Sequence, residues 1–141
     1  MLVRLMYASR GSAANDPAAL QAILNQSRAN NPALGITGLL CCSGGIFMQV
    51  LEGSRDAVNR IYNRIVADPR HSDVVLLRYE EIDERRFAGW AMGQVNLARL
   101  NPGLVLKYSP TATLDPYAVS GRVSMALFDE LAATASIVER S

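Results

Sequence analysis

The chain has 141 residues, half of them apolar, and a formal net charge of +1. One domain is the default at this length, and such a chain can bury a substantial core without disulfides or metal. The near-zero charge gives no electrostatic reason to bind nucleic acid or an anionic membrane, and no apolar run approaches the ~20 residues of a membrane helix. We therefore expect a soluble, cytoplasmic protein with no nucleic-acid or membrane partner.

The two cysteines, Cys41 and Cys42, are adjacent in a strand-like run. Neighbouring side chains of a strand point to opposite faces, so we expect no disulfide between them. Their spacing fits no metal site either. Both are expected to be packing residues, and no metal is expected.

The first third of the chain predicts a strand followed by a helix. Apolar residues at 2–8 form the strand, with Tyr7 on one face. The pair Asp16-Pro17 is typical of a helix start, because an aspartate caps the first turn and proline fits inside it. The apolar spacing continues this helix to about residue 29, where we expect Asn30-Asn31-Pro32 to end it.

The middle of the chain predicts a hairpin, a second helix and two more strands. Residues 35–42 and 45–53 are strand candidates that a glycine turn joins. Ser54 can cap the second helix, and Asp68-Pro69 should stop it. Residues 74–81 and 90–95 follow as the fourth and fifth strands.

The resulting order, β-α-β-β-α-β-β, predicts a ferredoxin-like α+β fold with two helices on one face of the sheet. Residues 102–116 are rich in Pro, Ser and Thr and should be irregular. A last helix is expected over about residues 117–136, with Val119, Val123 and Leu127 in its apolar stripe. It should cover the second face of the sheet, which is apolar and otherwise bare.

The third strand contains a glutamine, Gln49, on a face that it shares with Phe47 and Leu51. Both faces of this strand are apolar, so the amide should be buried, and an unpartnered buried amide costs roughly 2–7 kcal/mol. The simplest interpretation is a bond from Gln49 to nearby backbone. Alternation along the strands also allows Tyr7, Gln49, Trp90 and Met92 to surround one slot between the helices and the sheet, which is the usual form of a ligand site.

Several segments in this order resemble the BLUF family of blue-light sensors that use flavin. They are Tyr7-Ala8-Ser9, Asn30-Asn31, Gly35-Ile36-Thr37-Gly38-Leu39-Leu40, Phe47-Met48-Gln49-Val50-Leu51-Glu52-Gly53, Asp68-Pro69-Arg70-His71 and Arg86-Phe87-Ala88-Gly89-Trp90-Ala91-Met92. Alone, Trp90 and Met92 would indicate core residues and His71 a surface residue. The joint match instead indicates a BLUF domain over residues 1–97, with residues 98–141 as the C-terminal extension of a short, single-domain type.

The resemblance implies roles for individual residues. Tyr7 resembles the donor of an electron and then a proton to light-excited flavin, and Gln49 the amide that rearranges beside flavin N5 and O4. Trp90 and Met92 resemble the fifth-strand pair that responds. The residues expected to hold the flavin are Tyr7, Ile23, Ser27, Asn30, Asn31, Phe47, Gln49, Arg64, Ile65, Asp68, Arg70 and His71, with Asn31 on the polar edge of the ring. Position 30 is His in some members and Asn here.

The resemblance also implies a sensor without enzymatic activity, a homo-oligomer and a separate downstream signalling protein. It favours FAD as the cofactor, with FMN possible. Two other classes stay open. One is a small phosphatase of acylphosphatase type, for which Ser9-Arg10-Gly11-Ser12 only faintly resembles the required phosphate loop. The other is a ligand-binding or assembly module without photochemistry.

Overall fold

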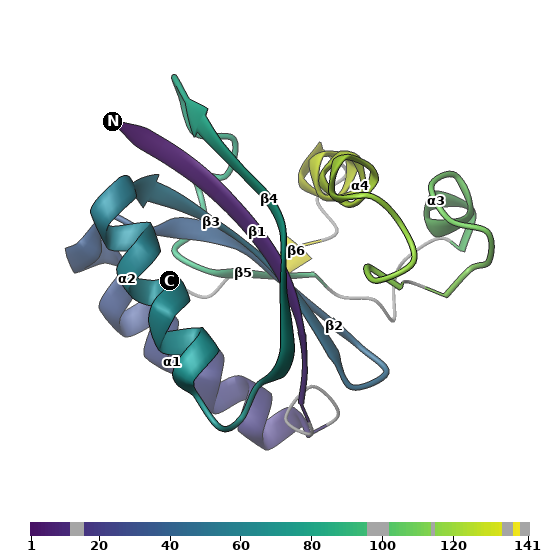
Figure 1. Ribbon diagram of the computed structural model, residues 1–141, viewed down its shortest axis with the longest axis horizontal. Helices are drawn as coiled ribbons and strands as arrows, with labels where there is room; N and C mark the ends of the chain where they lie inside the picture. The colour runs from purple at the N-terminus through teal and green to yellow at the C-terminus, as the bar shows by residue number, and fades with distance from the viewer. Residues whose placement is uncertain (12–15, 96–101, 114, 134–136, 139–141) are drawn as a thin grey trace.

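The computed structural model describes residues 1–11, 16–95, 102–113, 115–133 and 137–138. Helices α1 and α2 lie on one side of a central sheet, and α3 and α4 lie on the other (Figure 1). The strands are β1 (Leu2–Arg10), β2 (Thr37–Ser43), β3 (Ile46–Ser54), β4 (Ser72–Ile82), β5 (Gly93–Val95) and β6 (Ile137–Val138), and the helices are α1 (Pro17–Leu34), α2 (Arg55–Ala67), α3 (Pro102–Leu106) and α4 (Gly121–Ala133).

The sheet has the strand order β4-β1-β3-β2-β5-β6. β1 pairs antiparallel with both β3 and β4, and β2 pairs antiparallel with β3. β5 adds to β2 in parallel, and β6 pairs antiparallel with β5. The first four strands with α1 and α2 as crossovers make the ferredoxin-like plan, so the predicted α+β fold is confirmed.

Helix α1 is longer than predicted. It begins at the expected cap, where the Asp16 carboxylate accepts the backbone N–H groups of Ala18 and Ala19. It continues through Pro32, which costs the one helical hydrogen bond that the missing N–H of this residue would have donated. Gly35, with a φ of 67°, ends the helix in the left-handed conformation that glycine adopts without strain. Asn30 and Asn31 therefore lie within the last turns of the helix.

Glycines also fix the β2–β3 hairpin. Gly44 and Gly45 both have positive φ, as the central residues of a tight two-residue hairpin turn require. Farther along β2, Gly38 meets the backbone of β3 so closely that a Cβ there would lie 2.0 Å from the carbonyl oxygen of Val50. The register of this hairpin pairs Leu40 with Gln49 and so fixes where the glutamine lies on the sheet.

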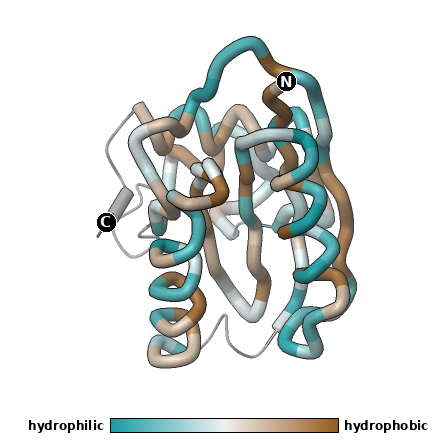
Figure 2. Tube along the Cα trace, turned by 90° about the vertical axis from the view of Figure 1, so that its left-hand side faces the viewer, coloured by the Kyte–Doolittle hydropathy of each residue, from teal (hydrophilic) through white to brown (hydrophobic). Residues whose placement is uncertain are grey.

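The sheet separates two apolar clusters. One joins Val3, Leu5 and Tyr7 to α1 and α2, and we call it the pocket-side cluster. The other joins strand residues such as Met6, Met48 and Val50 to α4, and we call it the α4-side cluster. Seen from the α1 and α2 side, these two helices lie in front of the strands (Figure 2). Each face of the sheet is therefore buried.

The two cysteines follow the predicted alternation. Cys41 is buried in the α4-side cluster, and Cys42 packs against the pocket-side cluster. Burial raises the pKa of the Cys42 thiol to about 12 and also raises the pKa of Cys41. Both thiols are neutral near pH 7, which agrees with a packing role.

The C-terminal part differs from the prediction in two ways. Residues 102–106 form the short helix α3 rather than irregular chain, since Pro102 can occupy a first helical turn. The last helix begins only at Gly121, because the Ser120 hydroxyl caps it by accepting the N–H of Val123. It ends at Ala133, and residues 134–136 lie outside the described residues.

The predicted position of the last helix is correct, but its predicted stripe is partly wrong. Met125, Leu127, Phe128 and Leu131 are buried against the sheet, whereas Val119 and Val123 are only half-buried. Val119 precedes the helix and Val123 lies in its first turn, so neither belongs to the part of the helix that packs on the sheet.

Candidate functional site

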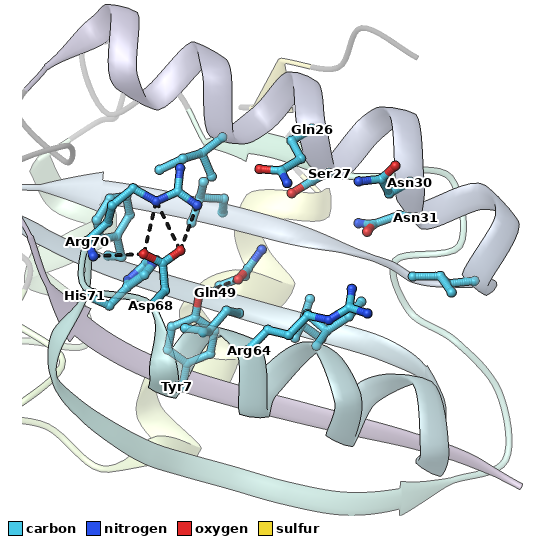
Figure 3. Close-up of a pocket in the computed structure, with 17 residues that line it drawn as sticks. Tyr7, Gln26, Ser27, Asn30, Asn31, Gln49, Arg64, Asp68, Arg70 and His71 are labelled. Carbon is cyan, nitrogen blue, oxygen red and sulfur yellow. Dashed lines mark hydrogen bonds and ion pairs between the residues drawn. The ribbon is translucent and has the colours of Figure 1, made fainter.

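A cavity of about 280 Å³ lies between the sheet and helices α1 and α2. Ligand pockets typically measure about 300–1,000 Å³, so this one is at the lower end of that range. Figure 3 shows polar side chains from both helices and from β1 and β3 around it. The lining residues are Tyr7, Ile23, Gln26, Ser27, Asn30, Asn31, Leu34, Leu40, Phe47, Gln49, Leu51, Ile61, Arg64, Ile65, Asp68, Arg70 and His71.

All twelve residues that the resemblance places around the flavin line this one cavity, whereas Trp90 and Met92, which strand alternation also placed at the slot, do not. Sequence reasoning did not include Gln26, Leu34, Leu40, Leu51 and Ile61 among the site residues. Gln26 could have been found, because it lies three positions after Ile23 and so shares a face of α1 with it. Leu40 could have been found from the register that places it opposite Gln49.

A chain of polar contacts crosses the floor of the cavity. The Tyr7 hydroxyl donates a short hydrogen bond to Oε1 of Gln49. Nε2 of Gln49 points the other way and donates to the sulfur of Met92 at 3.2 Å. Tyr7 and Met92 are almost fully buried, and Gln49 is only 6% exposed. The amide thus has a partner at each end, neither of them backbone.

Burial keeps Tyr7 protonated. Its pKa is raised well above the ordinary value, chiefly by desolvation and then by nearby Cys42, Tyr62 and Asp68. The ring of Tyr62 lies 5.8 Å from that of Tyr7 and excludes water from this side. Tyr7 is therefore a hydrogen-bond donor throughout the ordinary pH range, and no titration of its own interrupts the contact to Gln49.

Asn31 lies on the α1 wall and is also buried. Its Nδ2 donates to the backbone oxygen of Ala91 at 2.8 Å. Figure 3 shows Asn30 and Asn31 together at one end of the pocket. The amide set fits the hydrogen-bonding edge of a planar ring, which presents both donors and acceptors.

The outer part of the cavity is charged. Asp68 accepts from Arg70 at 2.7 Å, and these hydrogen bonds lower the pKa of Asp68 to about 2. Burial lowers the pKa of His71, and Asp68 opposes that shift. Nδ1 of His71 lies 2.8 Å from the buried Ser9 hydroxyl, which holds the imidazole against Phe47. Arg64 and Arg70 are exposed, and their guanidinium groups can bond the polar end of a bound ligand.

One predicted placement is wrong. Trp90 and Met92 were expected to share a strand face, but β5 begins only at Gly93, so strand alternation does not apply to them. Met92 belongs to the pocket-side cluster, whereas Trp90 packs against the α4-side cluster. Trp90 therefore does not line the slot with Tyr7 and Gln49.

These residues fit a flavin. The cavity joins apolar walls from Ile23, Ile65 and Phe47 to amide groups at one end and cationic groups at its mouth. That combination suits a flat, mostly apolar ring with a polar edge and a charged tail. Among the described residues, no group of three or more His, Cys, Asp and Glu side chains could hold a metal ion.

Comparison with known proteins agrees with this site. Residues 2–93 match the model of the BLUF family, described as sensors of blue light using FAD. The chain belongs to the BLUF family, and its function is blue-light sensing with a flavin. The BLUF domain itself is a sensor and not an enzyme.

The curated relatives are much longer proteins. The photoactivated adenylate cyclase subunit beta of Euglena longa is 38% identical over 92 residues, which are 64% of this chain and 11% of that protein. The chain spans about a tenth of the first curated relatives. Their cyclase activity is therefore not part of the likeness.

Two solved structures resemble the chain over nearly its whole length. The photo-activated state of BlsA has a TM-score of 0.82 at 30% identity, covering 100% of this chain and 99% of that one. BlrB, a BLUF protein in its dark state, has a TM-score of 0.75 at 34% identity, covering 94% and 96%. These matches support the same fold and class.

The enzyme alternative is not favoured. Ser9 and Arg10 belong to strand β1 rather than to a phosphate-binding loop, and the Ser9 side chain is fully buried against His71. Ser12 lies outside the described residues. The described part of the chain holds no helix long and apolar enough to cross a membrane.

Proposed function

We propose that this chain is a reversible light switch whose photoactive group is the series Tyr7–Gln49–Met92, with FAD in the cavity between α1 and α2. The observation that carries the proposal is the position of the Gln49 amide, which bonds Tyr7 at one end and Met92 at the other. When bound, the flavin supplies the absorption of blue light and, once excited, the acceptor for an electron. The family description supports FAD over FMN.

Tyr7 is the donor in this scheme. Its hydroxyl is protonated, buried and already hydrogen-bonded to Gln49, so an electron and then a proton can leave it without a change in fold. Return of both leaves no net chemistry. What changes is the hydrogen bonding of Gln49, by amide rotation or by tautomerisation.

Reversal of the Gln49 amide has a direct consequence for Met92. In the structure, Nε2 of Gln49 donates to the Met92 sulfur, an arrangement that we assign to the dark state. After reversal an oxygen faces that sulfur, and neither atom can donate a hydrogen bond to the other. Buried polar mismatches cost about 1–3 kcal/mol, which suffices to shift a two-state equilibrium.

The proposal is tested by the visible spectrum of the purified protein. We expect a yellow protein whose flavin is released as FAD on denaturation. Blue light should shift its absorption to slightly longer wavelength, reversibly and without bleaching. Colourless protein that cannot be reconstituted with FAD or FMN would refute the proposal.

Asn31→Ala should weaken flavin binding by about tenfold, because it removes an amide that hydrogen-bonds the polar edge of the ring. The measurement is a flavin titration of the apoprotein. Asn25→Ala, on an exposed part of α1, is the matched control and should bind as the wild type does. Unchanged affinity in Asn31→Ala would place Asn31 away from the ring.

Met92→Ala should leave the absorption shift largely intact but reduce the light-dependent change in α4. The alanine still allows Gln49 to rearrange, but it has no sulfur whose hydrogen bond to the amide could change. Hydrogen exchange of residues 121–133, in the dark and in the light, measures this. Equal exchange in both states of a photoactive wild type would mean that the signal leaves by another surface.

We further propose the division of the chain into a photosensor over residues 1–97 and an extension over residues 98–141, with output through α4 to a separate protein or to a change of oligomeric state. The end of the family match at residue 93 and the packing of α4 on the far face of the sheet support this. We also propose that the protein is a homo-oligomer in the cytoplasm and that it has no nucleic-acid or membrane partner.

A further inference from the structure

The segment from Arg86 to Met92 passes from one side of the sheet to the other. Near its start, Phe87 is fully buried in the α4-side cluster. At its end, Met92 is fully buried in the pocket-side cluster, against Gln49. A turn within the segment, in which the N–H of Trp90 donates to the oxygen of Phe87 at 3.2 Å, joins the two parts. We call it the crossing segment.

The start of the crossing segment is held by a buried carboxylate. Glu52 of β3 accepts the backbone N–H of Phe87 at 2.8 Å and that of Arg86 at 3.0 Å. Its charge is balanced by Arg4 of β1, whose Nε lies 2.8 Å from Oε2. Both side chains are nearly inaccessible, Arg4 at 4% and Glu52 at 0%. Such a pair is costly to bury and adds little stability by itself. Its two bonds to backbone N–H groups therefore indicate a positioning role.

The start also contacts the output helix. The Arg86 guanidinium donates to the carboxylate of Asp129 on α4 at 2.6 Å. Since Phe87 packs in the same cluster as Phe128 and Leu131, a displacement of this end of the segment changes the surroundings of α4 directly.

The end of the crossing segment is held by its carbonyl groups. Three consecutive ones are bonded, each from a different donor: the N–H of Gly38 to Trp90 at 3.0 Å, Asn31 to Ala91 at 2.8 Å, and Nε of Arg28 to Met92 at 3.0 Å. Arg28 thus fixes the backbone of the residue whose sulfur accepts from Gln49. It is half-buried on α1, and it lies outside the set of residues that line the cavity.

We infer that Arg28 and Glu52 are positioning residues of the switch, which hold the two ends of the crossing segment so that Met92 and Phe87 move together. This inference rests on the proposed function. With both ends anchored, a displacement of Met92 that follows from a change in its contact with Gln49 cannot be absorbed by Met92 alone. The whole segment moves, and the movement reaches α4 through Phe87 and Arg86. Neither residue is expected to touch the flavin.

Arg28 is tested by the rate at which the illuminated protein returns to its dark spectrum. We expect Arg28→Ala to return about fivefold faster or more, because the segment no longer resists reversal of the amide. Arg28→Lys keeps a donor of similar reach and should restore a rate near that of the wild type. Arg60→Ala, at an exposed ion pair on α2, is the control. A wild-type rate in Arg28→Ala, with equal flavin content and melting temperature, would overturn the inference.

Glu52 is tested in the dark, by exchange of the Phe87 amide. Glu52→Gln should speed that exchange by about tenfold or more, the effect of losing a bond to a charged acceptor, while amides in the middle of β1 exchange as before. It should also reduce the light-dependent change in α4. Wild-type protection of Phe87, or an undiminished change in α4, would contradict the assignment.

A second variant covers the case in which Glu52→Gln does not fold. The double variant Arg4→Met with Glu52→Leu removes both members of the buried pair, and such replacements are often tolerated. Glu80, the other partner of Arg4, keeps its ion pair with Arg78. The same loss of Phe87 protection is expected of the double variant. Failure of the proposed function is seen separately, as a wild type without a flavin shift, whereas the dark exchange of Phe87 tests the Glu52 anchor in either case.

Discussion

Tyr7→Phe should give a folded protein that binds flavin and has lost the normal reversible absorption shift. The phenyl ring keeps its place against Val3, Leu5 and the ring of Tyr62, so the pocket retains its shape. The hydroxyl is the only atom removed, and with it goes the proton that Tyr7 donates to Gln49. In the wild type, burial keeps that proton on Tyr7. The phenyl ring of the variant has no proton to donate in its place.

The stability cost of this change should be modest. Oxygen Oε1 of Gln49 loses its donor, and an unsatisfied buried acceptor costs about 1–3 kcal/mol. The measurements are the dark-minus-light difference spectrum and the melting temperature. Tyr62→Phe, which changes the neighbouring half-buried tyrosine, is the matched control and should keep the wild-type shift. A Tyr7→Phe protein with an unchanged photocycle would remove Tyr7 from its proposed role.

The arrangement of the first four strands and of the pocket was predictable because it depends on local patterns. Alternation placed Tyr7 and Gln49 on the inner faces of β1 and β3, and the observed register pairs these two residues directly. The caps at Asp16 and Ser54 fixed where α1 and α2 begin. Since both crossovers cover the same face, the polar residues of that face had to meet under the helices.

The features that sequence reasoning missed depend on contacts between distant segments. Nothing local indicates that Trp90 lies on the α4 side, because the bends before β5 are set by carbonyl bonds to Arg28, Asn31 and Gly38. The pairing of Arg4 with Glu52 is likewise invisible along the chain, since the two residues are 48 positions apart. Resemblance to a family identified the site, but it did not show how the crossing segment is anchored.

Gln49→Leu should bind flavin and show no light-induced absorption shift. Leucine has similar bulk and suits the apolar floor formed by Leu40, Phe47 and Leu51, so the cavity should stay closed and the fold intact. The substitution removes the amide, which has a donor end and an acceptor end. No other side chain between Tyr7 and Met92 can reverse a donor and an acceptor in this way.

The matched control for this variant is Gln26→Leu, which makes the same substitution at an exposed position on the α1 wall of the same cavity. It should keep the shift, because Gln26 does not contact Tyr7 or Met92. In Gln49→Leu the buried Tyr7 hydroxyl loses its acceptor, so the melting temperature should fall by the equivalent of about 1–3 kcal/mol, less the gain from the buried leucine. A wild-type shift in Gln49→Leu would show that the absorption change arises elsewhere in the pocket, since the amide is the one group that this substitution removes.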